Sequence, residues 1–264
     1  MYAFDYHRPA SVADAVSLLK GAGDGVLLAG GMTLIPTLKQ RLASPSDVVD
    51  LARIEELKGI RQAGDSVVIG AMVTHGEVAS SQVVKAVIPS LAGLAAMIGD
   101  PQVRARGTIG GSIANNDPAA DYPAAVVGLN ATVHTNKRQI AGDAFFTGMF
   151  ETALAEDELV TSVSFPKPEK ASYAKFPNPA SRYAIVGVMV VRTGGAVRVA
   201  VTGAAPCVFR SSDMESALAG NFAASALDGI EVKPDGLNGD IHASAAYRAH
   251  LVKVMAKRAV AAAS

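Results

Sequence analysis

The stretch Asp100–Pro123 reads D-P-Q-V-R-A-R-G-T-I-G-G-S-I-A-N-N-D-P-A-A-D-Y-P, and the rest of the chain is organised around it. It holds three glycines, three acids, two arginines, two asparagines and three prolines. Such residues lose conformational entropy when they are ordered and bury little apolar surface. The composition therefore predicts a binding segment made of backbone turns and polar groups, not a piece of the hydrophobic core.

A second glycine motif lies far upstream, at Ala29-Gly30-Gly31-Met32-Thr33. It follows a predicted buried strand at 26–29 and precedes a predicted short helix at 34–40, which brings backbone amides to the start of a helix. The same combination of two glycines beside hydroxyl residues occurs again at Thr108-Ile109-Gly110-Gly111-Ser112. Amides and hydroxyls that converge from two such motifs suit a diphosphate. The alternative is that each motif is an ordinary tight turn, and neither fits the P-loop or the G-x-G-x-x-G pattern.

Composition narrows the class of protein. The 264 residues are 50% hydrophobic, which is enough for a packed core, and the length favours two domains. Lys plus Arg and Asp plus Glu both number 24, so the net charge is zero, and we expect no nucleic-acid partner. Cys207 is the single cysteine and cannot form an internal disulfide or hold a metal cluster. The sequence predicts no signal peptide at 1–9, no membrane span and a cytoplasmic location.

The pattern of elements predicts an α+β fold. Short strands and helices alternate up to a proline-rich and charged boundary at Pro166–Lys170. Strands and a glycine hairpin follow, and then an Ala-rich helical tail whose last helix is predicted at 251–263. We predict a first module at 1–168, divided into parts at roughly 1–55 and 56–168, and a C-terminal module at 169–264 with an antiparallel sheet and helices.

Catalytic groups are hard to find in this chain. Asp117 and Asp121 can each accept a ribose or ribityl hydroxyl or cap a helix, and capping fits Asp117 better. Ser112 lacks the flanks of a nucleophile elbow, and Cys207 is typical of a packed thiol. The histidines have no metal-binding spacing, and we interpret each as a surface or satisfied core residue; they are His7, His75, His134, His242 and His250. The sequence predicts neither a metal site nor a catalytic residue.

Three of these stretches resemble one known family. A-G-G-M-T at 29–33, G-T-I-G-G-S at 107–112 and N-D-P-A-A-D-Y-P at 116–123 resemble the FAD-binding subunit of molybdenum hydroxylases, the xanthine dehydrogenase family. K-F-P-N-P-A-S-R-Y-A-I-V-G-V at 175–188 is most similar to the medium subunit of aerobic carbon monoxide dehydrogenases. The resemblance covers nearly the whole chain and implies a vanillyl-alcohol-oxidase-like flavin module followed by the family's C-terminal module.

The resemblance also implies a set of FAD contacts. The two glycine motifs would wrap the diphosphate, Ile98 would line the cofactor, and Tyr183 would cover one face of the isoalloxazine ring, unless it is a simple strand aromatic. Relatives often carry His-Ser where this chain has Met32 and Thr33, so Met32 lacks the polar side chain that those relatives have at this position. The implied cofactor-binding residues are Ala29, Gly30, Gly31, Met32, Thr33, Ile98, Thr108, Ile109, Gly110, Gly111, Ser112, Asp121, Val160, Lys175 and Tyr183.

The implied function is electron transfer through FAD in a heterotrimer. A large subunit would carry the molybdenum cofactor and a small subunit the 2Fe–2S clusters, in a dimer of heterotrimers. The flavin would pass electrons to an external acceptor such as a quinone or NAD. Two alternatives stay open, a stand-alone flavin oxidase or reductase of the same fold and a non-redox nucleotide-binding module. Carbon monoxide, a purine, an N-heterocycle and an aldehyde all remain possible substrates of the assembled enzyme.

Overall fold

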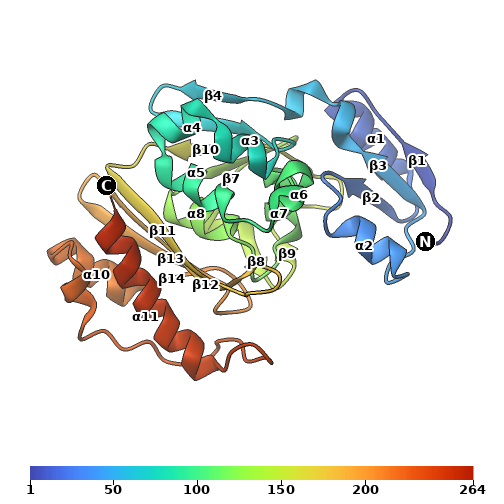
Figure 1. Cartoon of the computed structure of the whole chain (residues 1–264). Coiled ribbons are helices and arrows are strands. Elements are labelled where there is room, and N and C mark those ends of the chain that lie inside the picture. The colour runs from blue at the N-terminus through green and yellow to red at the C-terminus, as the bar shows by residue number, and fades with distance from the viewer. Residues whose placement is uncertain (264) are drawn as a thin grey trace.

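The computed structural model describes residues 1–263, so Ser264 of the predicted C-terminal module lies outside the described residues. Three larger sheets follow one another along the chain, and Figure 1 shows them from the N-terminal part on one side to the C-terminal helices on the other. Helices and antiparallel strands occur together, so the predicted α+β class is confirmed. The sheets change close to residues 55 and 168, but the division into domains stays our prediction.

The N-terminal sheet is parallel and small, with the order β1-β3-β2. Ser11 caps its first helix by accepting a hydrogen bond from the Asp14 amide, as the sequence predicts. Because parallel neighbours need a crossover, helices connect the strands. The elements are β1 (Asp5–His7), α1 (Val12–Gly21), β2 (Gly25–Leu28), α2 (Leu34–Lys39), β3 (Asp47–Asp50), η1 (Leu51–Arg53) and η2 (Glu55–Leu57).

The middle sheet is antiparallel, with the order β4-β5-β10-β6-β7. Its strands are β4 (Ile60–Ala63), β5 (Ser66–Gly70), β6 (Thr132–Thr135), β7 (Gln139–Ala141) and β10 (Val160–Pro166). A helical layer covers it in Figure 1. The helices are α3 (His75–Ser80), α4 (Gln82–Val87), α5 (Pro89–Ala96), α6 (Pro101–Arg106), α7 (Ile109–Asn115), α8 (Tyr122–Gly128) and α9 (Gly142–Phe145). A small hairpin, β8 (Phe146–Gly148) with β9 (Glu151–Thr152), follows them.

The third sheet is antiparallel, with the order β11-β12-β13-β14. Its elements are β11 (Lys170–Pro177), β12 (Ala184–Thr193), β13 (Ala196–Thr202), β14 (Phe209–Arg210), α10 (Ser212–Gly220), η3 (Ala224–Leu227) and α11 (Ala245–Ala262). The predicted hairpin is confirmed, because Gly194 and Gly195 both have positive φ between β12 and β13.

Both faces of the third sheet are buried. Tyr173 and Met189 belong to the same core as the middle sheet and its helices. Val188 and Val190 point the other way, into a core shared with α10 and α11. This explains why β12 is almost uniformly apolar in sequence. The C-terminal part of the chain therefore does not stand apart, since one of its faces completes the core of the middle part.

Two local predictions were wrong. The stretch 100–123 does contribute to the core, because Ile109, Ile113 and Tyr122 are fully buried on α7 and α8. Its prolines and polar residues begin and cap helices that carry these apolar side chains inward. The last helix begins at Ala245, not at residue 251, because Ser244 caps it through the Tyr247 amide.

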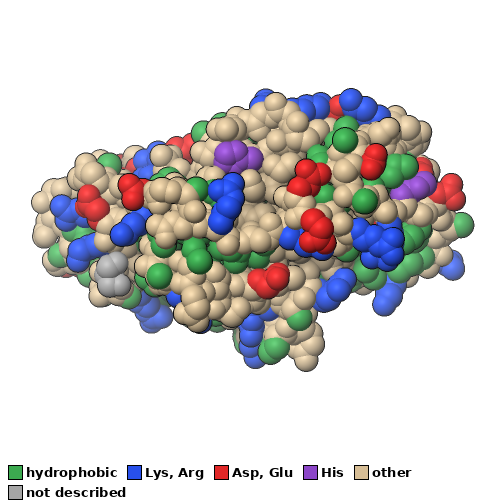
Figure 2. Space-filling view, turned by 90° about the horizontal axis from the view of Figure 1, so that it is seen from above, with side chains coloured by type: hydrophobic (Ala, Val, Ile, Leu, Met, Phe, Trp, Pro, Cys, Tyr) green, Lys and Arg blue, Asp and Glu red, His purple; other side chains and the backbone are tan. Residues whose placement is uncertain are grey.

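The surface and the helices show two further general features. On the face in Figure 2, acidic and basic side chains lie interspersed, in keeping with the zero net charge. Among residues 1–263, none of the helices combines the length and the apolar character that crossing a bilayer requires.

Candidate functional site

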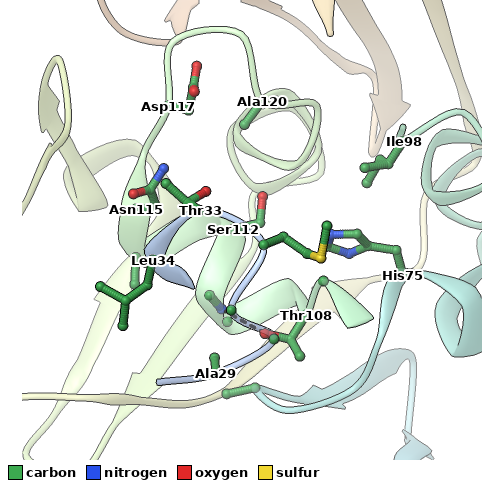
Figure 3. A pocket seen from close by; sticks show the side chains of 18 of the residues that line it. Ala29, Thr33, Leu34, His75, Ile98, Thr108, Ser112, Asn115, Asp117 and Ala120 are labelled. Carbon is green, nitrogen blue, oxygen red and sulfur yellow. Dashed lines mark hydrogen bonds between the residues drawn. The ribbon is translucent and has the colours of Figure 1, made fainter. Parts of the chain in front are cut away.

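A cavity of about 510 Å³ lies where the N-terminal sheet meets the helices of the middle part. The loop after β2, the start of α7, the loop before α8 and the segment before β12 form its walls, and Figure 3 shows several of these side chains. Most of the predicted cofactor-binding residues line it: Ala29, Gly30, Gly31, Met32, Thr33, Ile98, Thr108, Gly110, Gly111, Ser112, Asp121, Val160 and Tyr183. Ile109 and Lys175 are not on its surface; both side chains are buried behind the wall.

The first glycine motif offers free hydrogen-bond donors. Gly31 has φ +75°, a left-handed conformation that turns the chain sharply. Gly30 must lack a side chain, because a Cβ there would lie 2.0 Å from the Arg106 carbonyl oxygen. Within the described residues, the backbone amides from Gly30 to Thr33 donate to no protein acceptor. Consecutive free amides on a turn form a concave site for an anion.

The second glycine motif differs from the prediction. The Gly110 amide donates to the Ala71 carbonyl oxygen at 2.9 Å, and the Gly111 amide donates to Thr108 Oγ1 at 3.1 Å. These amides fix the start of α7 and are not free for a ligand. Of the amides in this motif, only that of Thr108 donates to no acceptor within the described residues, so the expected convergence does not involve the amides of Gly110 and Gly111. The second motif contributes small glycine surfaces and the Ser112 side chain to the pocket.

A buried ion pair stands behind one wall. Asp121 accepts hydrogen bonds from Lys175 Nζ at 2.8 Å and from the Tyr173 hydroxyl at 2.6 Å. Lys175 Nζ also donates to the Met97 carbonyl oxygen at 3.1 Å. Burial raises the pKa of Asp121, while the Lys175 charge and both hydrogen bonds act in the opposite direction. The network joins the start of α8 to β11, so it connects the pocket wall with the third sheet. Asp117 instead accepts from the Ala119 amide in a local turn, close to the predicted capping role.

A short loop holds Tyr183 at the pocket. The side chain of Asn178 accepts hydrogen bonds from the amides of Ala180 and Ser181, and the Asn178 amide donates to the Tyr183 carbonyl oxygen. Tyr183 precedes β12 and is 47% exposed, so it is not a strand aromatic. Partial burial, followed by the charges of Asp117 and Asp121, raises the pKa of its hydroxyl.

The pocket wall has two chemically different parts. One part is aliphatic and includes Leu27, Leu51 and Leu159, which pack together in the N-terminal core cluster; Glu158, next to Leu159, also lines the pocket. The other part includes His75 and Ile98, which lie on the opposite side of the pocket from Thr33 in Figure 3. The aliphatic residues were missed because they read as ordinary strand ends.

His75 was also missed, because nothing in its sequence context distinguishes it from the other four histidines. The structure corrects the interpretation of a satisfied core histidine. The residue is buried against the pocket, and its Nδ1 has no hydrogen-bond partner within the described residues. Burial, assisted by the nearby charge of Arg104, lowers the pKa of His75 to about 4.

Comparisons with known proteins agree with this geometry. Residues 2–168 match the family described as the FAD binding domain in molybdopterin dehydrogenase. The chain belongs to that family. The resemblance predicted from the glycine motifs is thereby confirmed, and membership makes the chain an oxidoreductase subunit whose cofactor is FAD.

The similarity extends over the whole flavoprotein subunit. The chain is 38% identical to the carbon monoxide dehydrogenase medium chain of Hydrogenophaga pseudoflava, over 98% of this chain and 96% of that one. It is 36% identical to the nicotine 6-hydroxylase medium subunit of Paenarthrobacter nicotinovorans, with the same coverage of both chains. A solved structure of carbon monoxide dehydrogenase from Oligotropha carboxidovorans aligns with a TM-score of 0.90 at 36% identity, over 98% of this chain and 96% of that one.

The pocket of this FAD-binding subunit fits its cofactor. Free amides between Gly30 and Thr33 suit a diphosphate, and the Ser112 and Thr33 side chains bring hydroxyls to the same cavity. A mainly apolar pocket with a few polar groups is typical of cofactor sites, and it suits the two ring systems of FAD.

Proposed function

We propose that this chain is the FAD-carrying electron-transfer subunit of a heterotrimeric molybdenum hydroxylase. The observation that carries the proposal is the pocket itself. Its wall combines the free amides of Gly30–Thr33 with an aliphatic part and with a part that contains His75 and Ile98. When bound, FAD supplies chemistry that accepts and releases electrons singly or in pairs. The protein's contribution is to bind the cofactor, orient it and shape its surroundings.

We assign the residues as follows. The amides of Gly30–Thr33 bind the diphosphate, with the small surfaces of Gly110 and Gly111 and the Ser112 hydroxyl opposite them. Ile98 and Tyr183 flank the flavin ring, and Ala29 and Val160 complete the wall. Lys175 acts through Asp121, whose carboxylate it holds in place, and Ile109 anchors α7 from the core side.

The comparison with relatives supports a division of labour between subunits. Medium subunits of enzymes named for carbon monoxide and for nicotine have nearly the same identity to this chain. This similarity supports our proposal that the part that distinguishes such different substrates lies in a partner subunit. We propose a large partner with the molybdenum cofactor, a small partner with 2Fe–2S clusters, assembly as a dimer of heterotrimers, and a quinone, NAD or another external acceptor. A cytoplasmic location stays a prediction.

The test is purification of the native complex through a tag on this chain, followed by analysis of flavin, iron and molybdenum. A complex with all three in constant ratio, whose flavin is reduced by the substrate only while both partners are attached, is the expected result. A chain that holds flavin and oxidises a substrate alone would instead be a stand-alone flavin oxidase. A chain that takes up nucleotides but no FAD would be a non-redox nucleotide-binding module.

A further inference from the structure

His75 is held rigidly in the pocket wall. Its amide donates to the Gly107 carbonyl oxygen at 2.9 Å, and the preceding Thr74 forms a capping box with Glu77. Thr74 also forms a β-bridge with Thr108, at the start of α7. The backbone on both sides of the cavity is thus joined at this point, and the imidazole has little freedom to move.

One edge of the imidazole reaches the cavity. A Cβ added at Gly107, which lines the pocket, would lie 2.5 Å from His75 Nε2. Because Gly107 has no side chain, the imidazole ring can occupy this space, and Nε2 lies at the pocket wall. Within the described residues the buried Nδ1 has no protein hydrogen-bond partner, and the residue is only 5% exposed. Nε2 also forms no hydrogen bond to the described residues, so a ligand in the cavity is the partner available to it.

A second unpaired group lies directly behind the first. The Tyr122 hydroxyl is fully buried and also has no partner. The two rings are in contact, with centroids 5.3 Å apart and an interplanar angle of 52°. The structure contains no hydrogen bond between them, so Tyr122 is a packing neighbour of the imidazole and Nδ1 stays without a partner. With Nδ1 buried and unpaired, the single proton of a neutral imidazole is best placed on Nε2, where a ligand can accept it.

The surroundings keep the imidazole uncharged. Arg104 lies close enough to oppose a second positive charge, and its guanidinium donates to the carbonyl oxygens of Ile98 and Gly99 at 3.0 Å each. These two residues line the same part of the pocket wall. With a pKa of about 4, His75 offers one N–H at neutral pH and no net charge.

We propose that His75 is a cofactor-binding residue whose Nε2–H donates a hydrogen bond to a carbonyl oxygen or ring nitrogen of the flavin. The inference rests on the proposed function and adds one residue to it. It extends the site beyond the glycine motifs, to a group that recognises the ring and not the diphosphate.

The contacts of this part of the wall favour the flavin half of FAD over the adenine half. Burial and the charges of Asp117 and Asp121 raise the pKa of the Tyr183 hydroxyl. Asp121 in turn accepts a hydrogen bond from Lys175, which also donates to the Met97 carbonyl oxygen beside Ile98. Ile98, one of the two residues assigned to the flavin ring, lies on the same side of the pocket as His75 in Figure 3. The aliphatic residues around Leu51 suit the adenine, and the Glu158 carboxylate beside Leu159 is already bound by Arg138.

The test compares His75→Leu, Tyr122→Phe and a matched control, His134→Leu, with the wild type. His134 donates to or accepts from Ser164 in the middle sheet and does not line the pocket. For each variant, FAD and ADP dissociation constants, the visible spectrum of bound flavin and the melting temperature of the cofactor-free chain are measured. ADP is the probe for the half of FAD that His75 should not contact.

We expect His75→Leu to raise the FAD dissociation constant about ten-fold, the effect of one lost hydrogen bond, and to shift the flavin bands. ADP binding should stay unchanged, and the melting temperature of the cofactor-free chain should stay or rise, because an unpaired nitrogen is removed. Tyr122→Phe keeps the shape of the core beside His75, and it should leave FAD binding and the flavin spectrum unchanged, because the phenol makes no hydrogen bond to the imidazole. His134→Leu should lower the melting temperature without altering FAD binding.

Equal FAD affinity and an unshifted spectrum in His75→Leu would overturn the inference and leave the proposed function intact. Equal weakening of FAD and ADP binding would also overturn it, since His75 would then act on the adenine half or on the fold. If His75→Leu does not fold, His75→Phe, which keeps a ring without its nitrogens, decides by the same criteria. A wild-type chain that binds no FAD would refute the proposed function itself.

Discussion

Replacing Lys175 with methionine would leave the Asp121 carboxylate buried without its cation. The side chains of both residues are almost completely inaccessible, at 2% and 3% exposure, and their N–O distance is 2.8 Å. Removing one partner from a buried pair costs about 3–5 kcal/mol, because the remaining charge is uncompensated. Since Tyr173 still donates to Asp121, we expect the lower end, about 3 kcal/mol at pH 7.

This loss should depend on pH with a defined sign. Burial already raises the pKa of Asp121 above its ordinary value of 3.8, and without Lys175 it would rise further. The folded variant would then bind a proton that the unfolded chain does not. Its free energy of unfolding must therefore increase as the pH falls from neutral toward 4. The difference between Lys175→Met and the wild type should shrink over that range.

Urea unfolding of the cofactor-free chain between pH 5 and pH 8 measures both effects. The double variant Asp121→Asn with Lys175→Met removes both charges, and it should be more stable at pH 7 than Lys175→Met alone. A destabilisation that is constant between pH 5 and pH 8, and that the double variant does not relieve, would refute the reasoning. The loss would then come from packing of the lysine stem and not from the uncompensated charge of buried Asp121.

Two further predictions concern other parts of the pocket. Gly30→Ala would place a Cβ 2.0 Å from the Arg106 carbonyl oxygen and should abolish FAD uptake, measured by absorbance, whereas Gly93→Ala, where a Cβ meets nothing within 4 Å, should leave uptake unchanged. Glu158→Gln should make the free energy of unfolding depend less on pH in the acid range. Arg138 lowers the pKa of Glu158 to about 2, so the wild type gains stability above pH 4.5 and loses it progressively as the pH falls toward 2; an unchanged acid slope in urea titrations of Glu158→Gln would contradict this.

Local patterns were sufficient for much of the fold. The cap at Ser11, the glycine hairpin between β12 and β13 and most strand positions follow from short-range chemistry that needs no distant partner. The stretch 100–123 was misjudged because its special residues start helices, and the core contacts of Ile109 and Tyr122 depend on elements far away in sequence. A count of polar residues carries no information about such contacts.

The two glycine motifs show where local reasoning about the site ends. Both have two glycines beside a hydroxyl residue, yet only in the motif at Gly30 do the glycine amides remain free within the described residues. The amides of Gly110 and Gly111 already donate hydrogen bonds, because α7 packs on Ala71 and is capped by Thr108. His75 illustrates the reverse, since an unremarkable histidine acquires its significance from Gly107, more than thirty residues away.

The position of the pocket implies that cofactor binding and folding are coupled. The N-terminal sheet has its own small core, to which Leu159 contributes from the middle part. Its loop at Gly30 also touches Arg106, and Lys20 pairs with Asp157 at 3.0 Å. The far wall depends on the third sheet through Asp121. A ligand that contacts the Gly30 loop, α7 and the Asp121 wall together bridges parts that otherwise share few contacts, and because it binds the folded chain it stabilises their arrangement by mass action.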